Sequence, residues 1–337
     1  MHLIKDTLDD LLNDSLNILL KDSPEYTATR GSFTEQIGVS LELRNPRARL
    51  SASDTKGKTF SAIGELLWYL SGSESLAFIS KYVEAYKDEQ VDGDVIYGAY
   101  GPRLYNSCGQ FNQFENILNI LKENPTSRKA VIQLFEARDV ANLLPQQIRS
   151  APCTCSLQCL LRDNSLHMIT YMRSNDAFLG LSHDIYAFTM MQEYYATALN
   201  VNMGTYKHVV GSLHLYDKHA RLAEDYLREG YQPTEYIMPP MPTGNQWEEI
   251  KKLLKLEERI RLGKSYNIES AQLNDYWKDI AYLLAFYHSQ KLNDVEGMKK
   301  IRSSIKEKIY YPILEKKIRS SLQKNNTIDD KGSVMPG

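Results

Sequence analysis

The sequence predicts an α+β fold that is followed by a helical C-terminal extension. Up to about residue 236, runs of apolar residues alternate between the period typical of strands and the spacing typical of helices. Two strand-like runs, 155–163 and 166–174, are joined by a short Asp-Asn-Ser turn, which is typical of a hairpin. After the proline cluster at 238–244, the chain is helical in pattern and rich in Lys and Glu to about residue 323. We therefore divide the chain into a main domain, residues 1–236, and an extension with a frayed tail, residues 237–337.

Local patterns predict the individual elements of the main domain. Residues 1–22 and 61–72 place apolar side chains at helical spacing, and a glycine ends the second of these helices. Residues 111–125 form another predicted helix, which Asn-Pro closes, and a further helix begins at about 184 and ends near 199. The predicted strands are 33–50, 128–136, 155–163, 166–174 and 207–216.

Composition excludes several classes of protein. The net charge of −2 and the pI of about 6.4 provide no basic footprint for nucleic acid, so we expect no nucleic-acid partner. No run of 18 apolar residues predicts a membrane span, and the acidic residues of segment 1–22 argue against a signal peptide. We therefore expect a soluble, cytoplasmic protein without a membrane partner. In a chain of 337 residues, four cysteines do not make a disulfide framework.

Cys153 is the first candidate for chemistry. It follows Pro152 at a predicted loop-to-strand junction, where a thiol can remain accessible. Cysteines are most often small buried apolar residues, and the spacing Cys-x-Cys-x3-Cys without a nearby histidine is a poor zinc site, so we expect no metal. A nucleophilic thiolate instead needs cationic neighbours. Such residues occur at predicted strand and loop ends: Arg30, Arg128, Lys129 and Arg173.

Two carboxylates also lie in unusual surroundings. Glu65 interrupts the apolar helix IGELLWYL, where burial would raise its pKa and suit it to general acid–base work, although it can equally lie on a polar helix edge. Asp184 lies between two apolar runs in LGLSHDIYAF, where it is either a helix N-cap or a contact to a ligand.

The cationic residues have two interpretations, a solvated surface or a phosphate site. Arginine binds phosphate through two parallel hydrogen bonds and lysine adds a point charge. Arg173 and Ser174 end a predicted strand and are followed by an Asn-Asp turn, which would point a guanidinium and a hydroxyl outward together. This segment favours phosphate binding.

Together these segments resemble the thymidylate synthase family over roughly residues 25–220. Its motifs are found here in the family's order, as Thr29-Arg30-Gly31, Glu65-Leu66-Leu67-Trp68, Tyr100-Gly101, Ser127-Arg128-Lys129, Pro152-Cys153, Gln158, Arg173-Ser174-Asn175-Asp176, Leu179-Gly180-Leu181 and His214-Leu215-Tyr216. The resemblance implies a large mixed β-sheet that forms a homodimer interface, with residues 1–236 as the catalytic domain. It also implies a nucleotide substrate and 5,10-methylenetetrahydrofolate as the one-carbon donor.

The resemblance assigns expected roles to individual residues. Cys153 would add to C6 of a pyrimidine nucleotide and activate C5, Glu65 would be the general acid–base group, and Tyr100 would help to remove the C5 proton. The other implied contacts are Arg30, Arg173 and Ser174 to the phosphate, Arg128 and Lys129 to the phosphate of a partner subunit, His214 and Tyr216 to the sugar, and Asp176 to the folate. Gln158 would face the phosphate or the base, and its role stays open.

One departure from the family pattern concerns the base. Asp184 stands where thymidylate synthases have Asn, whose amide both donates to O4 and accepts from N3–H of uracil. An ionised carboxylate only accepts, so it suits the 4-amino group of cytosine and repels O4 of uracil. A mismatched buried polar group costs about 1–3 kcal/mol. The substitution predicts the cytidylate branch of the family, with CMP or dCMP as the substrate.

Other departures concern the last step of the reaction. Thr154 follows the nucleophile where the family has His, Ser182-His183 replaces Pro-Phe, and the end of the chain, KGSVMPG, is not apolar. A wetter site is consistent with addition of water to the exocyclic methylene, which makes a hydroxymethyl product. His183 either positions that water or has a structural role. Lys129 replaces the second Arg of Ser-Arg-Arg, so the choice between ribose and deoxyribose stays open.

Two alternatives remain beside the cytidylate hydroxymethylase. One is a C5-methyltransferase acting on dCMP, CMP or dUMP, which would release dihydrofolate. The other is a non-catalytic, nucleotide-binding regulatory homologue. The second requires a damaged site, and the presence of Cys153, Glu65, Tyr100 and Asp184 argues against it.

Overall fold

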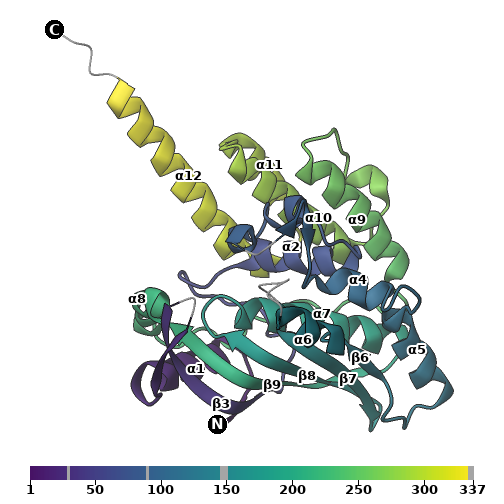
Figure 1. Ribbon diagram of the computed structural model, residues 1–337. Helices are drawn as coiled ribbons and strands as arrows, with labels where there is room; N and C mark the ends of the chain where they lie inside the picture. The colour runs from purple at the N-terminus through teal and green to yellow at the C-terminus, as the bar shows by residue number, and fades with distance from the viewer. Residues whose placement is uncertain (29–30, 89–90, 145–150, 333–337) are drawn as a thin grey trace. The chain divides into compact units, whose positions relative to one another are not determined.

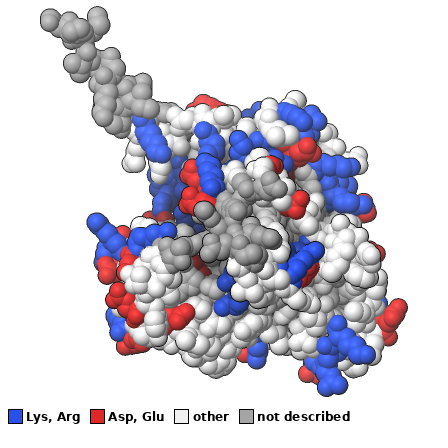
Figure 2. All heavy atoms as spheres, viewed as in Figure 1, with Lys and Arg blue, Asp and Glu red and all other residues white. Residues whose placement is uncertain are grey.

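The computed structural model describes residues 1–28, 31–88, 91–144 and 151–332 (Figure 1). Arg30, one of the predicted phosphate contacts, lies outside the described residues. The chain forms two compact units, Met1–Gln246 and Trp247–Gly337. No helix of the described residues is long and apolar enough to cross a membrane. Lys and Arg are interspersed with Asp and Glu over the face seen in Figure 2.

A seven-stranded mixed sheet forms the base of the first unit in the described part of the chain. Its strands, in spatial order, are β1 (His2–Lys5), β3 (Gly31–Leu43), β9 (Asn202–Tyr216), β8 (Ser165–Asp176), β7 (Thr154–Arg162) and β6 (Val131–Gln133), with β2 (Glu25–Ala28) beside β3. The β1–β3 and β8–β9 pairs are parallel, and the other pairs are antiparallel. The predicted α+β class with a large mixed sheet is therefore confirmed.

Helices contact the sheet and each other in a second layer. The helices α1 (Leu8–Lys21), α7 (Leu181–Ala198) and α8 (Asp217–Arg228) pack on strands, and α2 (Thr59–Leu70) packs on α7 (Figure 1). Nearly every side chain of α7 is buried, including polar ones, because the helix lies between the sheet and α2. Both α2 and α7 carry predicted site residues, so their packing positions the site.

Short elements complete the first unit. They are α3 (Leu76–Ile79), η1 (Glu84–Asp88), the two-stranded ribbon β4 (Val91–Asp92) and β5 (Val95–Ile96), α4 (Tyr100–Tyr105), α5 (Gln113–Glu123) and α6 (Ala137–Leu143). The segment after α8 also belongs to this unit, because Met238 N–H donates to the Arg47 carbonyl at 3.0 Å.

The second unit is helical, as its sequence pattern predicts. Its elements are α9 (Trp247–Arg261), η2 (Glu269–Ala271), α10 (Asp275–Lys291), α11 (Val295–Ser304), η3 (Lys308–Tyr310) and α12 (Tyr311–Gly332). The central helix is α10, which contacts α9, α11 and α12 and buries Trp277, Leu284 and Phe286.

Several element boundaries differ from the sequence-based predictions. Residues 2–5 are a strand rather than the start of a helix, because they pair in parallel with β3, a contact that no local pattern encodes. The predicted strand 33–50 ends at Leu43, and Asn202 rather than residue 207 begins the last strand. α7 begins at Leu181 instead of residue 184, and the amphipathic helix α8 was not predicted.

A buried ion pair anchors α7. Arg49, in the segment after β3, pairs with Glu193 of α7, and both side chains are almost fully buried. The other carboxylate oxygen of Glu193 accepts a hydrogen bond from Met241 N–H at 2.9 Å. Breaking such a pair leaves one buried charge uncompensated, and that is costly.

We therefore expect Glu193→Ala to destabilise the protein by about 3–5 kcal/mol, measured by urea unfolding with circular dichroism. The control is Glu42→Ala, which removes a cross-strand pair to the half-exposed Lys207. That change should cost about 1 kcal/mol or less, since exposed pairs contribute little. Equal losses for the two variants would contradict the proposed anchoring of α7.

Candidate active site

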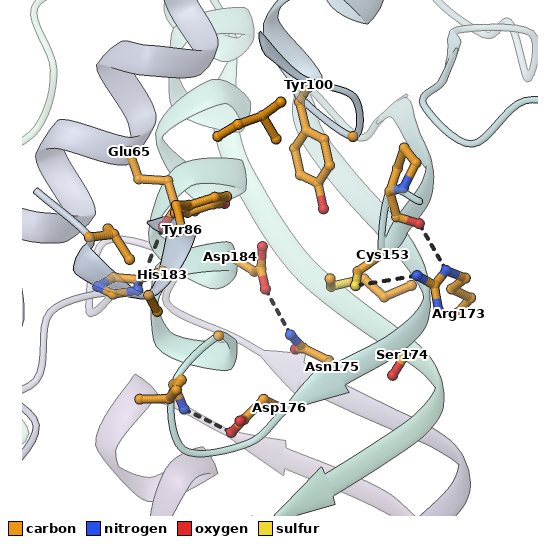
Figure 3. A pocket seen from close by; sticks show the side chains of 18 of the residues that line it. Glu65, Tyr86, Tyr100, Cys153, Arg173, Ser174, Asn175, Asp176, His183 and Asp184 are labelled. Atoms are coloured by element: carbon orange, nitrogen blue, oxygen red, sulfur yellow. Dashed lines mark hydrogen bonds and ion pairs between the residues drawn. The ribbon is translucent and has the colours of Figure 1, made fainter. Parts of the chain in front are cut away.

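One cavity of about 450 Å³ in the first unit collects most of the predicted site residues. It has the size of a small-molecule site. Figure 3 shows Glu65 and His183 on one side, Cys153 with Arg173 on the other, and Asp184 between them. The predicted residues among its lining are Glu65, Tyr100, Cys153, Arg173, Ser174, Asp176, His183, Asp184, His214 and Tyr216.

Cys153 immediately precedes β7, next to Arg173 of β8. The guanidinium donates to the Pro152 carbonyl at 2.9 Å and to the Ala151 carbonyl at 2.8 Å, and its Nη2 lies 3.8 Å from Cys153 Sγ. Arg173 therefore holds the loop before the thiol and places a positive charge beside the sulfur. A cation at this distance favours the thiolate, which is the nucleophilic form.

Tyr100 begins α4 and points into the cavity. Its hydroxyl oxygen accepts hydrogen bonds from the Thr154 backbone N–H at 3.1 Å and from Thr154 Oγ1 at 3.0 Å. Burial raises the pKa of Tyr100 well above its usual value, so the phenol stays protonated. Because two donors occupy the oxygen, its own O–H is available toward the cavity. Thr154, which replaces the family's His, thus orients this phenol.

Gly101, the residue after Tyr100, has no room for a side chain. A Cβ at Gly101 would lie 2.7 Å from the Gly72 carbonyl carbon and 2.8 Å from the Ser73 carbonyl oxygen. Both of these atoms belong to the backbone and have little freedom to move. The close approach fixes α4, and hence Tyr100, against the end of α2.

Glu65 lies in the middle of α2 and is 6% exposed. Its Oε1 accepts hydrogen bonds from Tyr69 at 2.9 Å and from Tyr86 of η1 at 2.5 Å. Burial raises the pKa of Glu65, and the two phenol donors oppose that shift by stabilising the anion. The carboxyl group lines the cavity and does not lie on a polar helix edge, so the second interpretation of this residue is wrong.

Asp184 lies in the first turn of α7, but it does not cap the helix. The helix begins at Leu181, and the N-cap is Gly180, so the predicted capping role of Asp184 is wrong. Instead its Oδ2 accepts a hydrogen bond from Asn175 Nδ2 at 2.7 Å. Burial raises the pKa of Asp184 well above its usual value, the charge of Glu65 adds to this effect, and the Asn175 contact opposes it.

Asn175 is in turn held by a line of buried side chains. Its Oδ1 lies 2.9 Å from His208 Nε2, and His208 Nδ1 lies 2.8 Å from the Tyr206 hydroxyl. Burial lowers the pKa of His208 to about 3, so the ring is neutral. The contact to Asn175 Oδ1 therefore assigns the ring proton to Nε2, and the Asn175 amide presents its N–H to Asp184.

Asp176 lies at the end of β8, where its Oδ1 accepts hydrogen bonds from Phe178 N–H at 2.8 Å and Leu179 N–H at 2.9 Å. Its Oδ2 lies 3.8 Å from His219 Nδ1 and retains room for another donor. The flat side chains Trp68 and Tyr86 line the same cavity. A carboxylate acceptor and aromatic side chains in one cavity fit a ring that carries an amino group, such as the pterin of a folate.

The remaining predicted residues fall into two groups. His214 and Tyr216 of β9 line the cavity with their rings in edge-to-face contact, 4.9 Å between centroids. Arg128 and Lys129 are exposed and do not line it. Gln158 also lies outside, and its Nε2 donates to the Arg128 carbonyl at 2.9 Å.

A family model of thymidylate synthase matches residues 21–278, about three quarters of the chain. The chain belongs to the thymidylate synthase family. Members of this family are one-carbon transferases that use methylenetetrahydrofolate and act at C5 of a pyrimidine nucleotide. The match covers the whole cavity and extends into the helical unit as far as α10.

Sequence reasoning missed the side chains that hold the acids. Tyr86 lies in a short 3-10 segment, and its distance from Glu65 in the chain conceals their contact. Asn175 lies within the Arg-Ser-Asn-Asp motif, next to residues with expected roles, yet its side-chain contact with His208 of the neighbouring strand β9 exists only in the folded chain. For Tyr69 a signal exists: it follows Glu65 by four residues on a helix, so the two side chains share one face.

We expect Arg173→Gln to slow alkylation of Cys153 by iodoacetamide about tenfold at neutral pH, since a neutral amide no longer favours the thiolate. The rate is measured by mass spectrometry of the Cys153 peptide, because the exposed Cys108 also reacts. Arg162→Gln, at the far end of β7, is the matched control for loss of one positive charge. If both variants slow alkylation equally, the effect comes from net charge and not from the contact.

Proposed function

We propose that this protein transfers a one-carbon unit from 5,10-methylenetetrahydrofolate to C5 of a cytidine 5′-monophosphate, CMP or dCMP, and that water completes the hydroxymethyl group. The observation that carries the proposal is the Asp184 carboxyl group, which lines the cavity opposite Cys153 and accepts from Asn175. The thymidylate synthase fold supplies the general reaction, and Asp184 supplies the base preference.

The Asn175 contact makes Asp184 a directional reader of the base. Because Asn175 Nδ2 donates to Oδ2, that oxygen remains an acceptor, and a proton favoured by burial resides on Oδ1. In the proposed pose Oδ2 accepts from the 4-amino group of cytosine, and Oδ1 shares a proton with N3. Uracil would place its acceptor O4 against Oδ2, which is also an acceptor. Its donor N3–H would face the protonated Oδ1, which is also a donor.

The remaining residues of the cavity suit the chemistry at C5 and C6. The Cys153 thiolate, beside Arg173, adds to C6 and makes C5 nucleophilic. When bound, the folate supplies the methylene carbon that C5 attacks. The Tyr100 hydroxyl, whose oxygen accepts two hydrogen bonds from Thr154, keeps its own O–H to orient a water that would take the C5 proton, and Glu65 would exchange protons through water. Loss of the C5 proton and departure of tetrahydrofolate would leave an exocyclic methylene on C5, to which water would add before the thiolate leaves C6.

The phosphate and sugar contacts follow the family pattern. Arg173 and Ser174 at the end of β8 would hold the 5′-phosphate, together with Arg30, and His214 with Tyr216 would hold the sugar. Asp176 would hold the pterin through Oδ2, and Trp68 and Tyr86 would line its ring.

We also propose a homodimer through the open face of the sheet. Alternate β8 residues such as Met168 and Met172 are buried against helices, whereas Tyr171 between them is 44% exposed, and Ile37 of β3 is 72% exposed. Arg128 and Lys129 are exposed outside their own cavity, which is consistent with a contact to a partner's phosphate. Sedimentation that finds only a monomer at micromolar concentration would contradict this assembly.

The test of the function incubates the protein with methylenetetrahydrofolate and each of CMP, dCMP, UMP and dUMP, followed by mass spectrometry. We expect CMP or dCMP to gain one CH₂O unit, and tetrahydrofolate to accumulate. A methylated product together with dihydrofolate would show a methyltransferase instead. Full biological activity of a Cys153→Ala variant would favour a non-catalytic, nucleotide-binding role.

We expect Asp184→Asn to move the preference from cytidylate toward uridylate by about ten- to a hundredfold in the ratio of kcat/KM values. An amide can donate to O4 of uracil and accept from its N3–H, which the Asn175-bound carboxyl group cannot do. Tritium release from C5 of each nucleotide measures the ratio. Asp176→Asn, on the folate side, is the control and should leave the ratio unchanged; an unchanged ratio in the Asp184 variant would mean that another residue reads the base.

A further inference from the structure

We infer that Ser61 and His183 form a proton relay that connects Glu65 with solvent at Ser61. The relay deepens the proposed function, since it rests on Glu65 being the acid–base group of that reaction. Neither residue follows from the family motifs, because position 183 is Phe in the usual pattern and a phenyl ring carries no proton.

The two carboxylate oxygens of Glu65 face different partners. Its Oε1 is occupied by the phenol donors Tyr69 and Tyr86, at 2.9 and 2.5 Å. Its Oε2 faces His183 Nδ1 at 3.6 Å (Figure 3). That separation is longer than a hydrogen bond, but catalytic contacts are often long in ligand-free structures and shorten on binding. Oε2 is therefore the oxygen at which Glu65 can gain or lose a proton toward the imidazole.

The other ring nitrogen leads to a hydroxyl with two possible acceptors. Ser61 Oγ lies 2.9 Å from His183 Nε2 and also 2.9 Å from the Lys58 carbonyl oxygen. A hydroxyl has one hydrogen, so Ser61 donates either to the imidazole or to the carbonyl. In the first arrangement Nε2 accepts and the ring proton is on Nδ1. In the second, Nε2 carries the proton and Ser61 accepts it.

These two arrangements match the two protonation states of Glu65. An ionised Glu65 favours the ring proton on Nδ1, facing Oε2, with Ser61 donating to Nε2. For Glu65 to become protonated, one proton enters from water at Ser61 Oγ, the Ser61 hydrogen passes to Nε2, and the Nδ1 proton passes to Oε2. Ser61 and the imidazole ring each give up one proton for the one they receive, Glu65 gains one proton, and the reverse sequence returns it to water. Ser61 is partly exposed, so water can reach its oxygen.

The surroundings of His183 disfavour an imidazolium. The neutral ring must therefore release a proton from one nitrogen as it accepts one at the other. Burial lowers the pKa of His183 to about 3, and the charges of Lys56 and Lys58 lower it further, while a hydrogen bond to the Leu179 carbonyl opposes them. A standing imidazolium is therefore excluded at neutral pH. The ionisable groups that interact with Glu65 are Tyr69 on α2, Tyr86 on η1, and His183 and Asp184 on α7, and Lys56 and Lys58 act on His183.

The kinetic test compares Ser61→Ala and His183→Phe with a matched control, Ser71→Ala. Ser71 lies at the end of the same helix and donates only to the Trp68 carbonyl in the described structure, at 2.8 Å. We expect kcat to fall about tenfold or more in the two relay variants, with KM for the nucleotide within about twofold, because proton transfer is slowed and binding is not. Small buffers such as imidazole should restore part of the rate in the His183→Ala variant by replacing the missing ring.

The pH profile supplies a second readout. Without the His183 N–H, the Glu65 anion loses a neighbour that stabilises it, so the pKa of Glu65 rises above its already raised value. The activity limb that requires ionised Glu65 should therefore move to higher pH in His183→Phe. A purely structural His183 would lower stability or kcat without moving this limb and without rescue by buffer.

A third readout needs neither nucleotide nor folate. Nitrogen-15 NMR of the ligand-free protein, with His183→Gln to assign the signal, should show the ring proton moving from Nε2 to Nδ1 without imidazolium as the pH rises through the raised pKa of Glu65. A single unchanging tautomer, together with an unshifted rate limb, would overturn the relay. If the protein turns over uridylate rather than cytidylate, the proposed substrate fails, and tritium release from uridylate then tests the relay on its own.

Discussion

The central constraint in this protein is that two carboxyl groups, Glu65 and Asp184, share one buried cavity. Each raises the cost of ionising the other, and burial adds to that cost. The groups in contact with them in the described residues are mostly neutral: two phenols for Glu65 and one amide for Asp184. Neutral donors stabilise an anion without cancelling its charge, so each acid can still change its protonation state.

The elements around the cavity hold these donors in place. α2 supplies Glu65 and Tyr69 four residues apart, and η1 brings Tyr86 to the same oxygen. On the other side, Asn175 of β8 contacts His208 of the neighbouring strand β9, and α7 brings Asp184 to Asn175. The buried Arg49–Glu193 pair fixes the opposite end of α7. Rigid elements, and not loops, therefore set the angle at which each carboxyl group meets a ligand.

The sequence predicts the groups that do chemistry better than the groups that support them. Cys153, Glu65 and Asp184 are recognisable because a thiol after proline or an acid in an apolar run is locally unusual. Their supports are ordinary residues whose importance comes from distant contacts, such as Tyr86 with Glu65 across 21 positions. The N-terminal strand was missed for the same reason, since its hydrogen bonds go to residues 40–43.

The two interpretations of Asp184 show how local and tertiary information differ. Aspartate ahead of an apolar run has good capping chemistry, and nothing local excludes that role. The helix starts three residues earlier because Gly180 N–H bonds the Asp176 carbonyl, and the Asp176 side chain takes up the N–H groups of Phe178 and Leu179. Asp176 thus supports the turn before the helix, and Asp184 is left to face the cavity.

The chemistry of hydroxymethylation makes the protonation of Glu65 a question of timing. One proton leaves C5 and another leaves the water that adds to the methylene, while the two folate nitrogens that lose the methylene carbon each take up one proton. A single buried acid that serves more than one of these transfers must change its protonation state between them. Phenols such as Tyr69 and Tyr86, with pKa values raised well above the usual range, cannot accept those protons. Of the groups in contact with Glu65, the imidazole is the one with a second nitrogen, and Ser61 beside that nitrogen is partly exposed. His183 therefore provides a path for protons in a protein whose proposed reaction admits water. A phenylalanine, which the usual family pattern has at this position, would provide no such path.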